Sequence, residues 1–243
     1  MGLESNVNKS NSLLNNTNLS DGLLLDSENF FQKNRLNFIV TIALINYSCI
    51  HFFVLPGSFA CAAFYDDGWM SVFSMLVISS ISVIITAMLC TSNNCREALT
   101  YAAMLIVNQV YAFREADLHT VFTEQYKVSS VTNLKFYTQT GVPLIAKVIP
   151  IFILCLFFIS AMSLIISYGL KIYKALIKGT PAAVAFIVWG ITLVISQIMD
   201  RSHYFYKSSS WRIRSLEEML EVAASVFALC AIIQFYKMRQ SKK

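Results

Sequence analysis

The sequence has few charged residues for its length. Asp, Glu, Lys and Arg make up 14% of its 243 residues, whereas a water-soluble domain carries about 25%. Hydrophobic residues make up 56%, which is more apolar surface than one soluble domain of this size buries. The composition therefore excludes an ordinary soluble domain. It also argues against nucleic acid as a partner, because the basic residues are spread over loops and form no continuous stripe.

Sequence motifs that identify a type of enzymatic reaction are also missing. The sequence has no glycine-rich phosphate-binding loop, no nucleophile elbow, no His-Glu-x-x-His pair and no heptad run. Its six cysteines form no Cys-x-x-Cys pair, and most lie in or beside apolar segments as small apolar side chains. The polar N-terminal residues do not resemble a secretory signal peptide. Function must therefore be inferred from where the polar residues gather.

Long apolar segments are the main feature that is present. A helix needs about 20 apolar residues to cross the hydrocarbon core of a bilayer. Within that core every backbone N–H and C=O must be bonded inside its own segment, so helices are expected. We predict an all-α polytopic membrane protein, a bundle of about six transmembrane helices in a lipid bilayer. The predicted segments are 37–55, 69–89, 98–113, 144–166, 182–199 and 219–235.

The ends of the chain differ from its middle. We expect one transmembrane domain at 36–238, a polar tail at 1–35 and a basic tail at 239–243. The N-terminal tail is rich in Asn and Ser and cannot bury enough apolar area to offset its chain entropy, so we expect it to be disordered. Six crossings put both termini on one side. A slight excess of Lys and Arg on that side predicts that it is cytoplasmic.

Ionisable residues gather at the predicted outer ends of three helices. Such groups are costly at the edge of the hydrocarbon, so they usually turn inward and find partners. Glu115 and His119 are four residues apart, and Asp200 and His203 are three apart, so each pair shares a helix face if its helix continues that far. We predict that the three helix ends form one outward-facing polar pocket. Its residues are Arg114, Glu115, Asp117 and His119, then Asp200, Arg201 and His203, then Glu217, Glu218 and Glu221.

Imidazole and carboxylate together suit a divalent metal such as zinc, iron or manganese. A metal with three protein ligands and one bound water would supply hydroxide for hydrolysis. An outer-face pocket would meet a lipid head group or another membrane-associated substrate. On this hypothesis the metal ligands are His119, Asp200, His203 and Asp117, the catalytic acid–base groups are Glu115, Glu218 and Glu221, and the anion-binding residues are Arg114 and Arg201.

Other interpretations of these residues stay open. Glu217 and Glu218 follow Ser215, and acids in the first turn of a helix ordinarily complement its dipole. The carboxylates also suit a metal-ion or proton-coupled transporter or sensor, although few polar residues beyond Asn108 and Gln109 continue across the membrane. A third possibility is a non-catalytic subunit of a larger membrane complex. The sequence leaves open whether the protein is an enzyme.

Several short motifs lie between residues 98 and 235. They are Phe113-Arg114-Glu115-x-Asp117-x-His119, Lys135-Phe136-Tyr137, Val142-Pro143-Leu144 with Lys147, Asp200, and Leu216-Glu217-Glu218-x-x-Glu221. In combination they resemble a group of bacterial multi-pass inner-membrane proteins of uncharacterised activity. The resemblance implies a location in the bacterial inner membrane and implies no chemistry.

Overall fold

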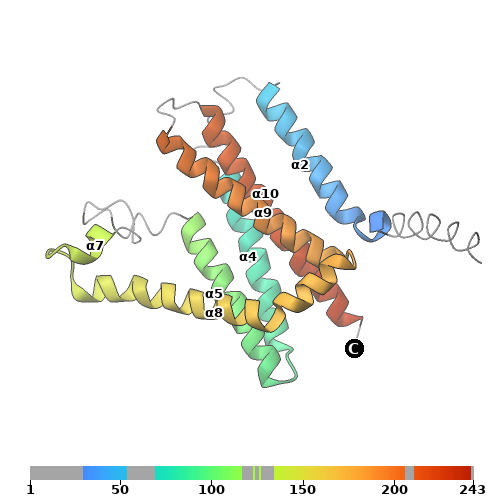
Figure 1. The fold of residues 1–243 in the computed structure, drawn as a ribbon, viewed down its shortest axis with the longest axis horizontal. Helices are drawn as coiled ribbons and strands as arrows, with labels where there is room; N and C mark the ends of the chain where they lie inside the picture. Colours follow the sequence, from blue (N-terminus) through green and yellow to red (C-terminus); the bar gives the residue numbers. More distant parts are fainter. Residues whose placement is uncertain are drawn as a thin grey trace, which may run out of the picture.

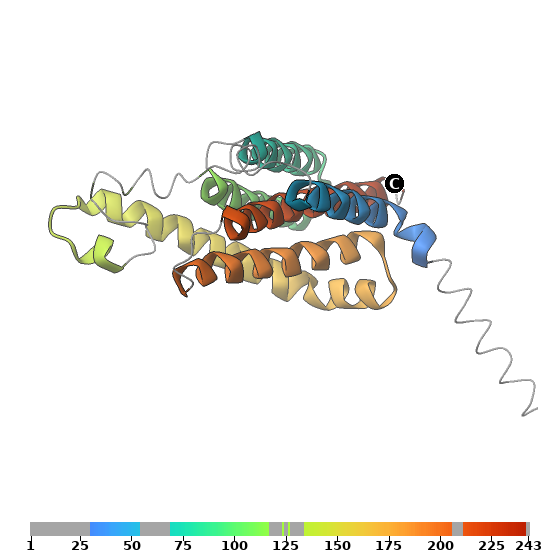
Figure 2. The ribbon, with the colours of Figure 1, turned by 90° about the horizontal axis from the view of Figure 1, so that it is seen from above.

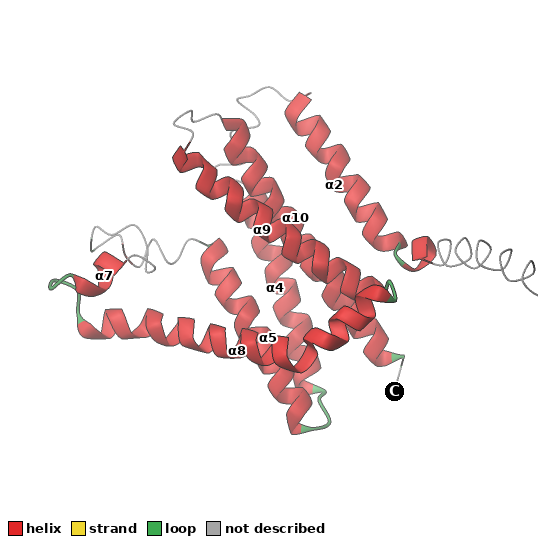
Figure 3. Cartoon of the chain, in the orientation of Figure 1, coloured by secondary structure: helices red, strands yellow, loops and turns green. Residues whose placement is uncertain are grey.

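The computed structural model describes residues 30–53, 69–116, 123, 126, 134–205 and 211–241. These residues form helices joined by short turns, and no strand occurs among them (Figure 3). Each predicted apolar segment overlaps one of the long helices, which confirms the all-α membrane fold. The helices are α2 (Arg35–Phe53), α4 (Trp69–Cys90), α5 (Cys95–Glu115), α7 (Leu134–Thr138), α8 (Leu144–Ile177), α9 (Pro181–Phe205) and α10 (Trp211–Gln240).

Four helices of the described chain are long and apolar enough to cross a membrane. They contain the segments Met70–Cys90, Leu144–Ile177, Pro181–Met199 and Ser215–Gln240. The apolar part of α2, Arg35–Ile50, is shorter. Helix α5 is more polar, with amides in its middle and charged residues near both ends. Length and composition therefore support four of the six predicted spans, with α2 and α5 as further helices of the bundle.

The surface of α8 is apolar. Its large side chains at Ile145, Phe152, Ile159, Ile166 and Leu170 are all exposed. Water would order around such a surface at a high cost in free energy. Lipid chains contact it without that cost, so the exposure pattern is that of a membrane-embedded helix.

Helix α10 is central to the bundle. It packs between α9 on one side and α4 on the other, and α5 packs against α4 and α8 (Figure 2). Helix α8 crosses the direction of α4 and α5 at a steep angle, with α7 beyond its N-terminal end (Figure 1). The main apolar cluster joins Ile81, Ile85 and Met88 of α4 to Tyr101 of α5 and Leu229 of α10.

Polar contacts show which helix ends lie together. Asn34 Nδ2 donates to Gly179 O at 3.0 Å, which places the start of α2 against the turn between α8 and α9. Gln234 Nε2 donates to Asn37 Oδ1 at 2.8 Å, which adds the C-terminal part of α10. The C-terminus is drawn beside the same end of the bundle (Figure 1). This grouping is expected when successive helices alternate in direction.

The helical chain begins before the predicted domain boundary at residue 36. Residues 30–33 are helical and Asn34 is buried. The rest of the predicted tail, residues 1–29, lies outside the described residues. At the other end, α10 continues to Gln240, into the segment predicted to be a basic tail.

Gly179 gives the first testable prediction. Its φ is +61°, and a Cβ built on it would lie 2.5 Å from the Phe30 ring. We expect Gly179→Ala to lower the free energy of unfolding by about 1–3 kcal/mol, the usual cost of a strained backbone residue. Thermal unfolding in detergent measures this loss. Gly190→Ala is the control, because its Cβ would meet nothing within 4 Å. Equal melting temperatures for the two variants would contradict the prediction.

Candidate functional site

An ion pair between α5 and α10 is the centre of the candidate site. Arg114 Nη2 lies 2.7 Å from Glu221 Oε1, and the side chains are 37% and 11% exposed. Ser196 Oγ of α9 donates to the same carboxylate oxygen at 3.2 Å. A buried carboxylate is stable only when it is paired and hydrogen-bonded. The guanidinium and the hydroxyl meet that requirement for Glu221.

A row of hydroxyl groups lies beside this ion pair. Ser74 Oγ of α4 donates to Glu115 Oε1 at 2.7 Å. The hydroxyls of Ser74 and Ser225 are 2.9 Å apart, and Tyr111 Oη lies 3.3 Å from Ser225 Oγ. Ser74 and Ser225 are fully buried, and in each hydroxyl–hydroxyl contact either group is able to donate. The row therefore connects three helices and ends on a carboxylate.

Helical spacing explains how the sequence places these side chains. Arg114 and Glu115 follow Tyr111 on α5 by three and four residues, so each lies near Tyr111 on that helix. Glu221 and Ser225 are four residues apart on α10, and Ser225 Oγ donates to Glu221 O at 3.1 Å. Two helix faces thus supply the ion pair and most of the hydroxyl row. Ser74 of α4 completes the row.

The structure brings together three of the residues predicted for the site. Arg114 and Glu221 are paired directly, and Glu115 is connected to α10 through the serine hydroxyls. Glu218 lies three residues before Glu221 on α10 and is partly buried. The other predicted site residues are Asp117 and His119, which lie outside the described residues, and Asp200, Arg201 and His203, whose backbone belongs to α9 and whose side chains are not described.

The observed helix ends alter the spacing arguments for the histidines. Helix α5 ends at Glu115, so the condition for a shared helix face of Glu115 and His119, that this helix continues to His119, is not met; His119 itself lies outside the described residues. Helix α9 continues to Phe205. Asp200 and His203 are therefore three residues apart within one helix, as predicted.

The start of α10 also differs from the expectation. The helix begins at Trp211, so Glu217 and Glu218 are not in its first turn. Their interpretation as ordinary acids at the helix N-terminus is therefore wrong. The charged N-terminal part of α10 is helical although it is too polar to be recognised from hydropathy.

Sequence reasoning missed the hydroxyl groups of the site. Tyr111 lies four residues before Glu115, and Ser225 lies four residues after Glu221, so helical spacing from a carboxylate would have found both. Ser74 and Ser196 have no such signal. Their positions depend on how α4 and α9 are aligned against α10, which a single sequence does not contain.

The described residues contain no group of three or more His, Cys, Asp and Glu side chains that could hold a metal ion. Within that part of the chain the site consists of carboxylates, a guanidinium and hydroxyls. Such groups hold and pass protons, and carboxylates also bind hard cations.

Comparison with known proteins assigns neither a family nor a function to the chain. No protein-family model, no curated protein and no solved structure matches the chain. The function of the site is therefore argued from its own chemistry.

The ion pair gives the second testable prediction. Arg114→Met leaves Glu221 buried without its cation, and because Arg114 is partly exposed we expect a loss of about 1–3 kcal/mol in unfolding free energy. Glu221→Leu should cost a similar amount. The double variant should regain most of the loss, since neither charge remains. Thermal unfolding of all four proteins in detergent forms a double-mutant cycle. Additive losses in the double variant would show that the two residues are not coupled.

Proposed function

We propose that the protein binds protons within the membrane, as a proton-coupled transporter or sensor, and that Glu115 receives the proton. The observation that supports this is the row of hydroxyls from Tyr111 through Ser225 and Ser74 to Glu115. Ionisable residues inside a membrane bundle commonly belong to proton or ion pathways. Hydroxyls suit such a pathway, because each is both a donor and an acceptor.

The hydrogen bonds of this row can be donated in either of two directions along it. With Glu115 ionised, Tyr111 donates to Ser225, Ser225 to Ser74, and Ser74 to the carboxylate. When Glu115 binds a proton, its own O–H donates to Ser74 and the direction reverses. Ser225 then donates to Glu221 O, a contact already present at 3.1 Å. Binding of one proton on α5 therefore changes a hydrogen bond within α10.

The ion pair has a separate role in this proposal. Arg114 fixes α5 against α10 through Glu221, and α4 packs against both helices. This keeps Ser74 and Ser225 within hydrogen-bond distance of each other. Arg114 is therefore a positioning residue, and Glu115 is the residue that changes its protonation.

We further propose that this membrane is a bacterial inner membrane and that both termini face the cytoplasm. The end of the bundle that holds the start of α2 and the end of α10 carries Lys171, Lys174, Lys178, Lys237 and Arg239. Basic residues near helix ends favour the cytoplasmic side. The Arg114–Glu221 pair and the hydroxyl row then lie toward the outer face.

Infrared difference spectroscopy tests the proposed function directly. Acidification of the purified protein should produce a protonated-carboxyl band, and this band should be absent in Glu115→Gln. In Ser74→Ala the band should persist at a shifted frequency, because the carboxyl group has lost the hydrogen bond to Ser74. Ser80→Ala is the matched control, since its hydroxyl donates only to Leu76 O within α4. A band that is unchanged in Glu115→Gln would refute the proposal.

The metal-dependent hydrolase is a second candidate for the same region. It is favoured by the continuation of α9, which keeps Asp200 and His203 in the same helix as Ser196, a contact of Glu221. The substrate would be a lipid or another membrane-associated molecule, and the metal would be zinc, iron or manganese.

Metal analysis of the purified protein tests this second candidate. A hydrolase of this kind should contain near-stoichiometric metal that is lost in both His119→Ala and Asp200→Ala, because the two residues would share one ion. Ser80→Ala should keep its metal. Repeated preparations without metal, including after incubation with each ion, would rule this candidate out.

A further inference from the structure

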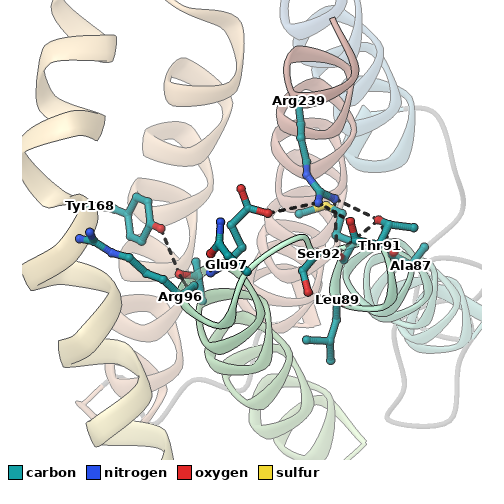
Figure 4. Close-up of polar contacts among 11 residues, drawn as sticks. Ala87, Leu89, Thr91, Ser92, Arg96, Glu97, Tyr168 and Arg239 are labelled. Atoms are coloured by element: carbon teal, nitrogen blue, oxygen red, sulfur yellow. Dashed lines mark hydrogen bonds and ion pairs between the residues drawn. The ribbon is translucent and has the colours of Figure 1, made fainter. Parts of the chain in front are cut away.

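A second polar cluster lies at the opposite end of α10. Arg239 Nη2 donates to Thr91 O at 2.9 Å and to Glu97 Oε2 at 3.4 Å, and its Nη1 donates to Thr91 Oγ1 at 3.1 Å and to Met88 O at 3.3 Å. Its guanidinium carbon lies 5.1 Å from the centre of the Tyr101 ring. Figure 4 shows Arg239 reaching from α10 to the end of α4 and the start of α5. We call these five residues the Arg239 cluster.

The two clusters are separated by a bilayer-sized distance along the same helices. Glu221 and Arg239 are 18 residues apart on α10, and Glu97 and Glu115 are 18 residues apart on α5. Eighteen residues make five helical turns and about 27 Å, so both members of each pair share one helix face. The hydrocarbon core is about 30 Å thick. The clusters therefore lie at the two ends of one interface formed by α4, α5 and α10.

Polar side chains also occur in the middle of this interface. Asn108 Nδ2 donates to Ser82 Oγ at 2.8 Å and to Ile78 O at 3.1 Å, and Gln109 Nε2 donates to Ser82 Oγ at 2.9 Å. Ser82 lies about midway along α4 between Ser74 and Thr91. These contacts join α4 to α5, and Gln109 itself is exposed, so the partly buried polar group halfway along the interface consists of Ser82 and Asn108.

An apolar layer separates the central group from the Arg239 cluster. The side chains of Ile85 and Met88 of α4 are buried and belong to one apolar cluster with Leu105 of α5 and Ile232 of α10; Met88 contributes only its backbone carbonyl to the Arg239 cluster. A tightly packed apolar layer of this kind blocks water and ions until it is widened. The interface is therefore closed at this end in the observed structure.

We propose that this interface is a route for protons across the membrane that passes between α4 and α5 at its centre, with Ser82 and Asn108 as its central binding group and Arg239 as its closed gate. The inference rests on the proposed proton-binding function and extends it. Arg239 closes the route in two ways. Its charge repels cations, and its hydrogen bonds hold α10 against the C-terminal end of α4.

Opening of the route requires release of Arg239 from Thr91, which lets the apolar layer widen. The hydroxyl row and Arg239 belong to the same helix, because α10 is continuous from Trp211 to Gln240 and carries Ser225 of the row.

Proton flux into proteoliposomes tests the gate. The full-length protein is reconstituted with an internal pH-sensitive dye and an imposed potassium diffusion potential. Arg239→Gln should raise the flux about tenfold over wild type, as expected when a fixed charge that excludes protons is removed from a pore. Lys237→Gln is the matched control, because it removes the same charge from an exposed position on the same helix end. Equal flux in wild type and Arg239→Gln would overturn the gate.

The role of the central binding group is tested in the Arg239→Gln variant, in which the gate is expected to be open. Asn108→Leu combined with Arg239→Gln should lower the flux about tenfold relative to Arg239→Gln alone, because an apolar side chain removes the only amide that contacts both Ser82 and Ile78 among the described residues. Undiminished flux in this double variant would overturn the route through the centre.

One further variant and a comparison of the two measurements keep the outcomes separate. If Arg239→Gln does not fold, Glu97→Gln replaces it, because this variant weakens the same cluster at a more exposed position. Glu97→Gln should raise the proton flux about two- to fivefold. Unchanged flux in Glu97→Gln would overturn the gate. A carboxyl band that depends on Glu115, together with no flux in any variant, would refute the route and leave a proton sensor. If the wild-type protein shows no carboxyl band that depends on Glu115, the proposed function itself is refuted.

Discussion

Two ion pairs connect α5 to α10, one near each end of these helices, while α4 packs against both. Helix α5 carries Glu97 in its first turn and Arg114 in its last turn, and α10 carries Glu221 and, in its last turn, Arg239. Each acid meets the base of the other helix, which is possible only when the helices are antiparallel and in one register. The charges in the terminal turns also complement the helix dipoles. A slip of one residue would rotate a side chain by about 100° and break both pairs.

Small polar residues make this arrangement compatible with close packing. Ser74, Ser196 and Ser225 are all fully buried where α4 and α9 pack against α10. Small side chains let helices approach closely, and in hydrocarbon their hydroxyls also hydrogen-bond across the interface. The same residues therefore bring the helices together and satisfy the carboxylates. A larger residue at Ser74 or Ser225 would separate α4 from α10 and interrupt the hydroxyl row.

Hydropathy predicted the helices because lipid contact requires continuous apolar surface, and it predicted Arg114, Glu115 and Glu221 because charge is rare in such segments. It could not predict the contacts among helices. The start of α10 at Trp211 was missed because charged residues conceal it, and the break after Glu115 has no glycine or proline to mark it. Asn108 and Gln109 were judged too few to form a path across the membrane. They belong to an interface only because Ser82 of the neighbouring helix lies opposite them.

The hydroxyl of Ser74 differs from most hydroxyls of the apolar helices. A serine or threonine in an apolar helix is able to satisfy its hydroxyl on the carbonyl four residues earlier. Ser80, Thr86 and Thr192 do this, and Ser225 also donates to Glu221 O. Ser74 instead donates to Glu115 on another helix and contacts Ser225 on a third. These contacts contribute to the packing of the three helices, and they are also the contacts on which the proton transfer that we propose depends.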